Sequence, residues 1–146
     1  MSELPSRLSF VTLGTRDRER MREFYVALGF PIALDLDDFT AFHVGGVILA
    51  LYPIELLGGE AAPGEPPSDG WRGVTLGINV DRREDVDTAY AAAIAAGARP
   101  ITPPVDREYG PRSGYFADPE GNRWEVAYAN GVEFDARGAV VKFSPS

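Results

Sequence analysis

The chain has 146 residues, 45% of them hydrophobic, which is enough for one compact domain or two small modules packed closely together. Its net charge of −8 and its 14 scattered Lys and Arg residues argue against a nucleic-acid partner, which requires a basic face. The absence of cysteine excludes disulfides, thiolate metal sites and cysteine nucleophiles, and no apolar run reaches the roughly 18 residues of a membrane span.

The N-terminal residues MSELPSRLSF lack the basic, apolar and small-residue regions of a signal peptide. We therefore expect a cytoplasmic protein with no membrane partner.

The first half of the chain has the pattern of one βαβββ unit. Residues 8–14 alternate as a strand does, and Asp17 stands at the N-cap position of the helix that follows. Gly29 stands where a C-cap glycine belongs. The helix presents apolar residues at the i, i+3, i+4, i+7 spacing: Met21, Phe24, Tyr25 and Leu28. Three β-type stretches follow, at 32–36, 39–44 and 47–52.

The second half repeats this order. A strand at 73–80 leads into a helix that is closed by Gly97. The apolar face of this helix consists of Val86, Ala89, Tyr90, Ala93 and Ile94. Further β-type stretches lie at 99–102, 112–117 and 122–128. The tetrapeptide VTLG, at 11–14 and 74–77, suggests one alignment of the halves, but matching Tyr25 with Tyr90 aligns buried tyrosines and helix starts together. The two alignments differ by two residues, so both keep the same strand faces inward.

The predicted organisation is therefore a first module at 1–52, a linker at 53–72, a second module at 73–129 and a C-terminal tail at 130–146. The linker is rich in Gly, Pro and acidic residues, which favours a surface connection over packed structure. Residues 132–143 have the pattern of a small hairpin around Asp135 to Gly138, which would serve as a lid or an edge cover.

The segment GYFADPEGNRWEVAY at 114–128 predicts a complete β-hairpin. Pro119 presets φ for the first central turn position, and Gly121 supplies the positive φ that a type I turn followed by a bulge requires. On the outgoing strand Trp124 and Val126 point to one face, and Glu125 points to the other.

This tandem pattern resembles the glyoxalase/bleomycin resistance/dioxygenase group, the vicinal oxygen chelate (VOC) superfamily. The resemblance runs over residues 8–129 and rests on the strand–acid–helix opening VTLGTRDRERMREFYVALGF, the closing YFADPEGNRWEVA and the duplication. It implies an α+β fold in which tandem βαβββ modules form a curved, mostly antiparallel half-barrel sheet with flanking helices. The same fold carries metal lyases, dioxygenases, epimerases, thiol transferases and metal-free antibiotic-binding proteins, so function depends on the site.

The resemblance also assigns four metal-ligand positions, one on the first and one on the last strand of each module. They fall on Phe10, Ala50, Thr75 and Glu125, with Ala50 matched to Glu125 through the glycines Gly46 and Gly121. Only Glu125 has a ligating side chain, and catalytic divalent sites generally use about three protein ligands. We therefore expect no metal in the usual place and no other cofactor.

Glu125 is the candidate catalytic residue, because an acid on an inward strand face beside apolar neighbours is suited to general acid or base chemistry. The alternative is that Glu125 is a buried, hydrogen-bonded residue without a function. Six further residues are candidates for ligand binding from their inward parity or from their position near the cavity mouth: Phe10, Thr12, Tyr52, Thr75, Asn79 and Tyr109. Each of them also has an ordinary interpretation as a core or locally satisfied residue.

Two other groups have weaker indications. His43 is the single histidine, and no Asp or Ser is placed by sequence to orient it, so we interpret it as a surface or satisfied core residue. The turn-rich loop at 103–114 carries Arg107 and Arg112, either of which could pair with an anionic substrate group.

These observations favour a protein that binds a small organic molecule in a concave cavity without the usual divalent metal. The alternative is a metal-free lyase or isomerase that uses Glu125 for proton transfer on a carbonyl substrate, so enzymatic activity stays open. An accessory module whose cavity is filled by side chains is a third possibility. The resemblance also implies a homodimer, because half-barrel sheets of this superfamily usually complete their clefts with a second module.

Overall fold

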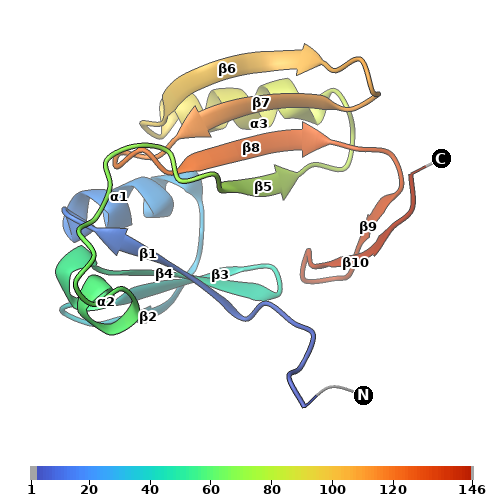
Figure 1. Cartoon of the computed structure of the whole chain (residues 1–146). Coiled ribbons are helices and arrows are strands. Elements are labelled where there is room, and N and C mark those ends of the chain that lie inside the picture. Colours follow the sequence, from blue (N-terminus) through green and yellow to red (C-terminus); the bar gives the residue numbers. More distant parts are fainter. Residues whose placement is uncertain (1–2, 146) are drawn as a thin grey trace.

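Two four-stranded sheets form the frame of the protein in the computed structural model, which describes residues 3–145 (Figure 1). The first sheet has the order β1-β4-β3-β2, with β1 (Phe10–Thr15), β4 (Val47–Pro53), β3 (Thr40–Val44) and β2 (Ile32–Asp35). The second has the order β5-β8-β7-β6, with β5 (Thr75–Asn79), β8 (Arg123–Tyr128), β7 (Arg112–Ala117) and β6 (Arg99–Asp106). In each sheet the first pair is parallel and the other two are antiparallel. The predicted α+β fold of repeated βαβββ modules is confirmed.

Helices α1 (Arg18–Leu28) and α3 (Asp85–Ala95) connect the first and second strands of their modules. The predicted caps of α1 are present: the Asp17 carboxylate accepts a hydrogen bond from Arg20 N at 3.1 Å, and Gly29 adopts φ 101°. Helix α3 begins at Asp85, after a turn at 81–84, and its predicted apolar face from Val86 onward lies within it.

A single hydrophobic core joins the two modules. It includes Phe24 and Tyr25 of α1 together with Phe116 and Trp124 of the second sheet. The rings of Phe116 and Trp124 stack with centroids 6.3 Å apart, and the Tyr25 ring lies 6.0 Å from that of Trp124. The first helix therefore packs against strands that lie about a hundred residues further along the chain.

The strand register fixes which side chains share a face. Phe10 is paired with Ile48 in the first sheet, and Thr75 is paired with Arg123 in the second. Ala50 and Glu125 each lie two residues further along the last strand, so they have equivalent positions in the two sheets. This register confirms the alignment of the halves through Tyr25 and Tyr90. Leu49 and Leu51 of β4 are in the core, so Ala50 points to the opposite side, here called the inner face of the sheet.

Helix α2 (Ile54–Ala61) lies within the segment that the sequence suggested to be an irregular surface connection. That expectation was wrong for these residues, since the helix packs against β1 and β4. Its contact is close: a Cβ added at Gly14 would lie 2.9 Å from Ile54 Cγ1. Gly58 and Gly59 lower the helix propensity of the segment, so the packing against the sheet has to supply the stability that propensity does not.

The edge strand β6 and the C-terminal hairpin complete the fold. Strand β6 continues to Asp106 through three prolines, which an edge strand with register shifts tolerates. The predicted hairpin is present as β9 (Val132–Phe134) and β10 (Val140–Phe143), and its turn is closed by hydrogen bonds at Asp135. Its tip lies against the β3–β4 turn of the first module, where Gly45 faces Gly138 (Figure 1). No helix within residues 3–145 has the length and apolar character needed to cross a membrane.

Candidate functional site

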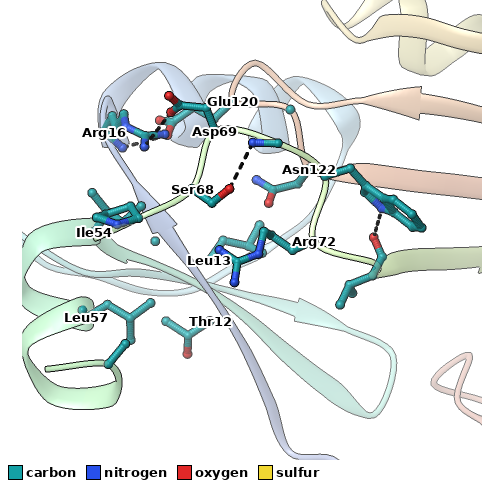
Figure 2. A pocket seen from close by; sticks show the side chains of 18 of the residues that line it. Thr12, Leu13, Arg16, Ile54, Leu57, Ser68, Asp69, Arg72, Glu120 and Asn122 are labelled. Carbon is teal, nitrogen blue, oxygen red and sulfur yellow. Dashed lines mark hydrogen bonds and ion pairs between the residues drawn. The ribbon is translucent and has the colours of Figure 1, made fainter. Parts of the chain in front are cut away.

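A cavity of about 540 Å³ lies at the junction of the two modules. It is bounded by β1, by α2, by the linker residues 65–72 and by the turn between β7 and β8 (Figure 2). Small-molecule sites commonly have volumes of roughly 300–1,000 Å³ and occur at such junctions. Both modules and the linker therefore contribute to one site of suitable size.

The cavity walls are largely apolar. Leu13 comes from β1, Ile54 and Leu57 come from α2, and Leu76 comes from β5. Trp71 adds an aromatic ring that is 61% exposed, and its indole N–H donates to the carbonyl of Val74 at 2.9 Å. This hydrogen bond holds the indole beside the cavity, where it offers a flat surface to a ligand.

The turn between β7 and β8 is rigid because Asp118 organises it. Its carboxylate is 1% exposed and accepts hydrogen bonds from the backbone N–H groups of Glu120 and Asn122 and from the Asn122 side chain, at 2.8–3.0 Å. The Tyr25 hydroxyl donates to it as well, at 2.7 Å. Burial, followed by the charge of Asp118, raises the pKa of Tyr25 well above its ordinary value. The predicted turn is thus confirmed, with Gly121 at φ 91°.

Glu120 joins this turn to the first module. Its two carboxylate oxygens accept hydrogen bonds from the backbone N–H groups of Arg16 and Asp17, each at 2.8 Å. These donors lie at the start of α1, where unpaired N–H groups and the helix dipole favour a negative charge. Arg16 in turn pairs with Asp69 of the linker at 3.1 Å (Figure 2). Three separate segments are thereby held around the cavity.

Glu125 lies elsewhere, on the inner face of β8, and is not among the residues that line the cavity. Its Oε2 accepts a hydrogen bond of 2.6 Å from the Tyr115 hydroxyl. This bond, with some burial, raises the pKa of Tyr115 to about 12. On the other side of Glu125 is Gly77, which has no side chain, and a Cβ added there would lie 4.0 Å from the second carboxylate oxygen. The arrangement is an oriented carboxylate that is able to accept a proton from a bound molecule.

Tyr115 is a site residue that the sequence interpretation missed. It lies directly opposite Glu125 in the β7–β8 register, so counting outward from the turn would have found it. The Arg107 guanidinium lies 5.7 Å from the centre of the Tyr115 ring and donates to the Ser113 hydroxyl at 2.8 Å. Leu57 was missed as well, because the linker gave no clear helical signal.

The other residues proposed from the sequence do not gather around one point. Thr12 lines the cavity, whereas Thr75 and Asn79 share the inner face of the second sheet with Glu125. Phe10 and Tyr109 are 56% and 79% exposed.

Tyr52 and His43 both have ordinary surroundings. Tyr52 packs edge-on against Phe39, with ring centroids 6.1 Å apart, and desolvation with the nearby Glu60 of α2 raises its pKa. His43 is exposed at the β3–β4 end of the first sheet.

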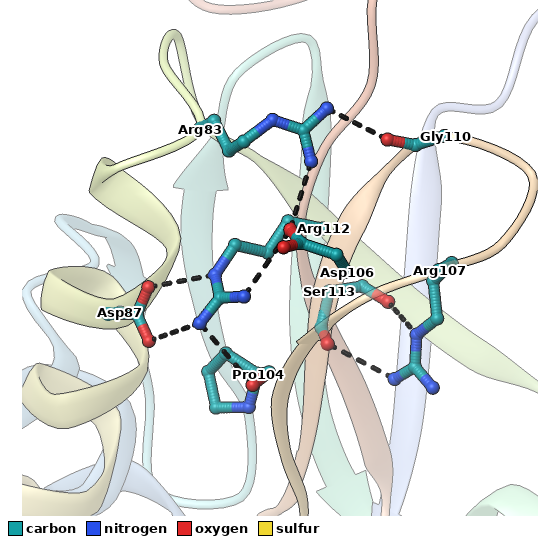
Figure 3. A network of polar contacts seen from close by, with 8 residues as sticks. All are labelled: Arg83, Asp87, Pro104, Asp106, Arg107, Gly110, Arg112 and Ser113. Carbon is teal, nitrogen blue, oxygen red and sulfur yellow. Dashed lines mark hydrogen bonds and ion pairs between the residues drawn. The ribbon is translucent and has the colours of Figure 1, made fainter.

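An ion-pair network fastens the loop after β6 (Figure 3). Arg112 binds both oxygens of Asp87 at 2.9 Å and also pairs with Asp106 at 3.4 Å. Arg83 pairs with Asp106 at 3.1 Å and donates to the Gly110 carbonyl at 2.8 Å. Arg112 is therefore already compensated by two carboxylates of the protein itself.

The four positions that the resemblance assigns to a divalent metal do not fit one. Phe10 and Ala50 offer no donor atom, Thr75 offers a neutral hydroxyl, and only Glu125 offers a carboxylate. Ala50 is fully buried on the face that α2 covers. Within residues 3–145 no group of three or more His, Asp or Glu side chains is placed to hold a metal ion.

Comparison with known proteins identifies the family of this architecture. The model of the Glyoxalase/Bleomycin resistance protein/Dioxygenase superfamily matches residues 7–126. A search of curated proteins finds no match.

Solved structures give the same result. A glyoxalase-related enzyme from Fulvimarina pelagi superimposes with a TM-score of 0.85 at 24% identity, covering 97% of this chain and 100% of its own. A glyoxalase/bleomycin resistance protein/dioxygenase from Nocardioides superimposes with a TM-score of 0.72 at 30% identity, covering 87% of this chain and 85% of its own. A family enzyme from Burkholderia phytofirmans PsJN gives 0.71 at 28% identity, with 84% and 98% covered.

Proposed function

Because the chain belongs to the glyoxalase/bleomycin resistance protein/dioxygenase superfamily, we propose that it binds a small organic molecule in the cavity between its modules. We further propose that binding occurs without a divalent metal at the four positions that superfamily enzymes usually use. The observation that carries this proposal is the cavity of about 540 Å³, whose apolar walls come from β1, α2 and β5.

The cavity is supported by contacts that would keep it open before a ligand arrives. Glu120 bridges to the start of α1, Asp69 pairs with Arg16, and the Trp71 indole is held by the Val74 carbonyl. A preformed site spends little binding free energy on ordering its walls. The ligand then gains mainly from removing apolar surface from water, at about 25 cal/mol per Å² before the costs of association.

A pair of neighbouring leucines on α2 provides the test. Leu57 lines the cavity, whereas Leu56 is 48% exposed and lies outside it. We expect Leu57→Trp to fill the cavity and to abolish the thermal shift that metabolites produce, and we expect Leu56→Trp to preserve it. The metabolite panel is screened in the presence of EDTA, so that a metabolite whose binding requires a divalent metal ion gives no thermal shift. The proposal fails if no metabolite stabilises the wild type, or if both variants retain the shift.

The second candidate function is proton transfer, and the hydrogen bond from Tyr115 to Glu125 favours it. The Glu125 carboxylate would take a proton from a carbon beside a substrate carbonyl and return it to another atom of the same molecule. Under this hypothesis Glu125→Gln abolishes turnover of a carbonyl substrate. If the protein only binds its ligand, the same change alters the affinity for a neutral ligand only modestly.

The assembly that we propose is a homodimer. On the inner face of the second sheet Thr75 is exposed and Glu125 half-buried in the single chain. Leu34 and Leu36 of the first module are 47% and 53% exposed. Equilibrium sedimentation that shows only monomer at micromolar concentration would contradict this proposal.

A further inference from the structure

We propose that the ligand of the intermodule cavity is an amphipathic carboxylate, and that Arg72 and Arg123 recognise its charged end. This inference rests on the proposed binding function and names the chemical class of the ligand. It comes from the polar groups around the cavity, which divide into those already paired within the protein and those left for a ligand.

Most of the acids at the cavity are already paired. Glu120 accepts the two backbone N–H groups before α1, and Asp69 pairs with Arg16. The side-chain NH2 group of the neutral Asn122 donates to Asp118. Glu65 is the remaining acidic residue of the lining, and it is exposed on the linker. Two of the three carboxylates of the lining are thus already paired within the protein.

The donors are less committed. Within residues 3–145, Arg72 has no ion pair or side-chain hydrogen bond, and Arg123 donates only to the neighbouring Gly121 carbonyl, at 2.7 Å. Arg72 and Leu13 both line the cavity (Figure 2). The Thr12 hydroxyl has no partner in the same described range, and Ser68 only accepts a long contact of 3.4 Å from Gly70 N. The uncommitted groups therefore include two guanidinium groups, which can only donate, and two hydroxyls, which can donate or accept.

A guanidinium presents a planar fork of N–H donors that matches the two oxygens of a carboxylate. A ligand with a carboxylate at one end would supply the charged acceptor that these two guanidinium groups lack. Its other end would contact Leu13, Ile54, Leu57 and the ring of Trp71, which require an apolar or aromatic body. An amide or alcohol of the same shape would offer these guanidinium groups no charged partner.

The experiment compares acids with their own amides, which have the same size and shape but no charge. Phenylacetate, 3-phenylpropionate and 4-phenylbutyrate are titrated against their amides by isothermal calorimetry at low salt. We expect the wild type to bind at least one acid about tenfold more tightly than its amide, and we expect the preference to weaken as salt rises.

The arginine variants locate the effect. The double change Arg72→Gln and Arg123→Gln should remove the preference for the acid. Arg99→Gln, at an exposed arginine outside the cavity, makes half of that charge change and should preserve the preference. A double control variant, with both Arg99→Gln and Arg20→Gln, matches the full charge change, since Arg20 also lies outside the lining.

The outcomes separate this inference from the function on which it rests. Amides that bind as tightly as their acids, or a preference that survives loss of both arginines, overturn the inference and leave the binding function standing. If neither acids nor amides bind, and the metabolite panel gives no thermal shift, the binding function fails and the inference fails with it.

Discussion

Tyr25→Phe should destabilise the protein more than the loss of one ordinary hydrogen bond. The Tyr25 hydroxyl is fully buried, donates to Asp118 at 2.7 Å and accepts from the Trp124 indole at 2.9 Å. The change keeps the ring and its packing but leaves the indole N–H without an acceptor and removes one donor from a buried carboxylate. Each of these effects costs about 1–2 kcal/mol, so the free energy of unfolding should fall by about 2–4 kcal/mol.

The repeat supplies a matched control. Tyr90 is the equivalent residue of the second module, and its hydroxyl donates to a neutral acceptor, the Tyr115 carbonyl, at 3.1 Å. Tyr90→Phe should therefore cost only about 0.5–1.5 kcal/mol. Urea unfolding followed by far-UV circular dichroism measures both values, with one transition expected because the core is shared. A loss for Tyr25→Phe that is no larger than for Tyr90→Phe would refute the reasoning.

Further expectations concern the contacts of Glu120, the pair formed by Glu125 and Tyr115, and the metal content. Glu120→Gln should lower the free energy of unfolding by about 1 kcal/mol, because the charged acceptor of the Arg16 and Asp17 N–H groups is lost, and urea unfolding measures this. Glu125→Gln should lower the pKa of Tyr115 from about 12 toward 10, as read from phenolate absorbance at 295 nm. The pKa of Tyr115 is higher in the folded state than in the unfolded state, so its hydrogen bond should stabilise the fold fully below about pH 10 and lose this effect as the pH rises through 12. A free energy of unfolding that does not change with pH in this range would contradict the hydrogen bond. Metal analysis after dialysis should find no stoichiometric Zn, Ni, Fe or Mn, and EDTA should leave Tm unchanged.

Local signals in the sequence predicted most of the fold. Asp17 and Gly29 mark the ends of α1 through capping chemistry that depends on only a few neighbouring residues. The turn around Gly121 then fixes the register of β8, so the faces of Trp124 and Glu125 could be assigned before any tertiary contact was known.

The parts that sequence did not predict depend on tertiary contacts. Helix α2 contains two adjacent glycines and is held by the fit of Ile54 against Gly14, which no local pattern reveals. The cavity between α2 and the linker was not predicted, for the same reason. Alternation correctly gives the inner face of each strand, but α2 and the linker cover part of that face and create the cavity beside Thr12 and Leu57, away from Glu125.

The position of a bound ligand in a crystal structure of the complex tests the central claim most directly. The expected result is a molecule against Leu13, Leu57 and Trp71, with no metal ion beside it. A ligand seated on the inner face of the second sheet, against Glu125 and Tyr115, would contradict the proposed binding site and would favour the proton-transfer function instead.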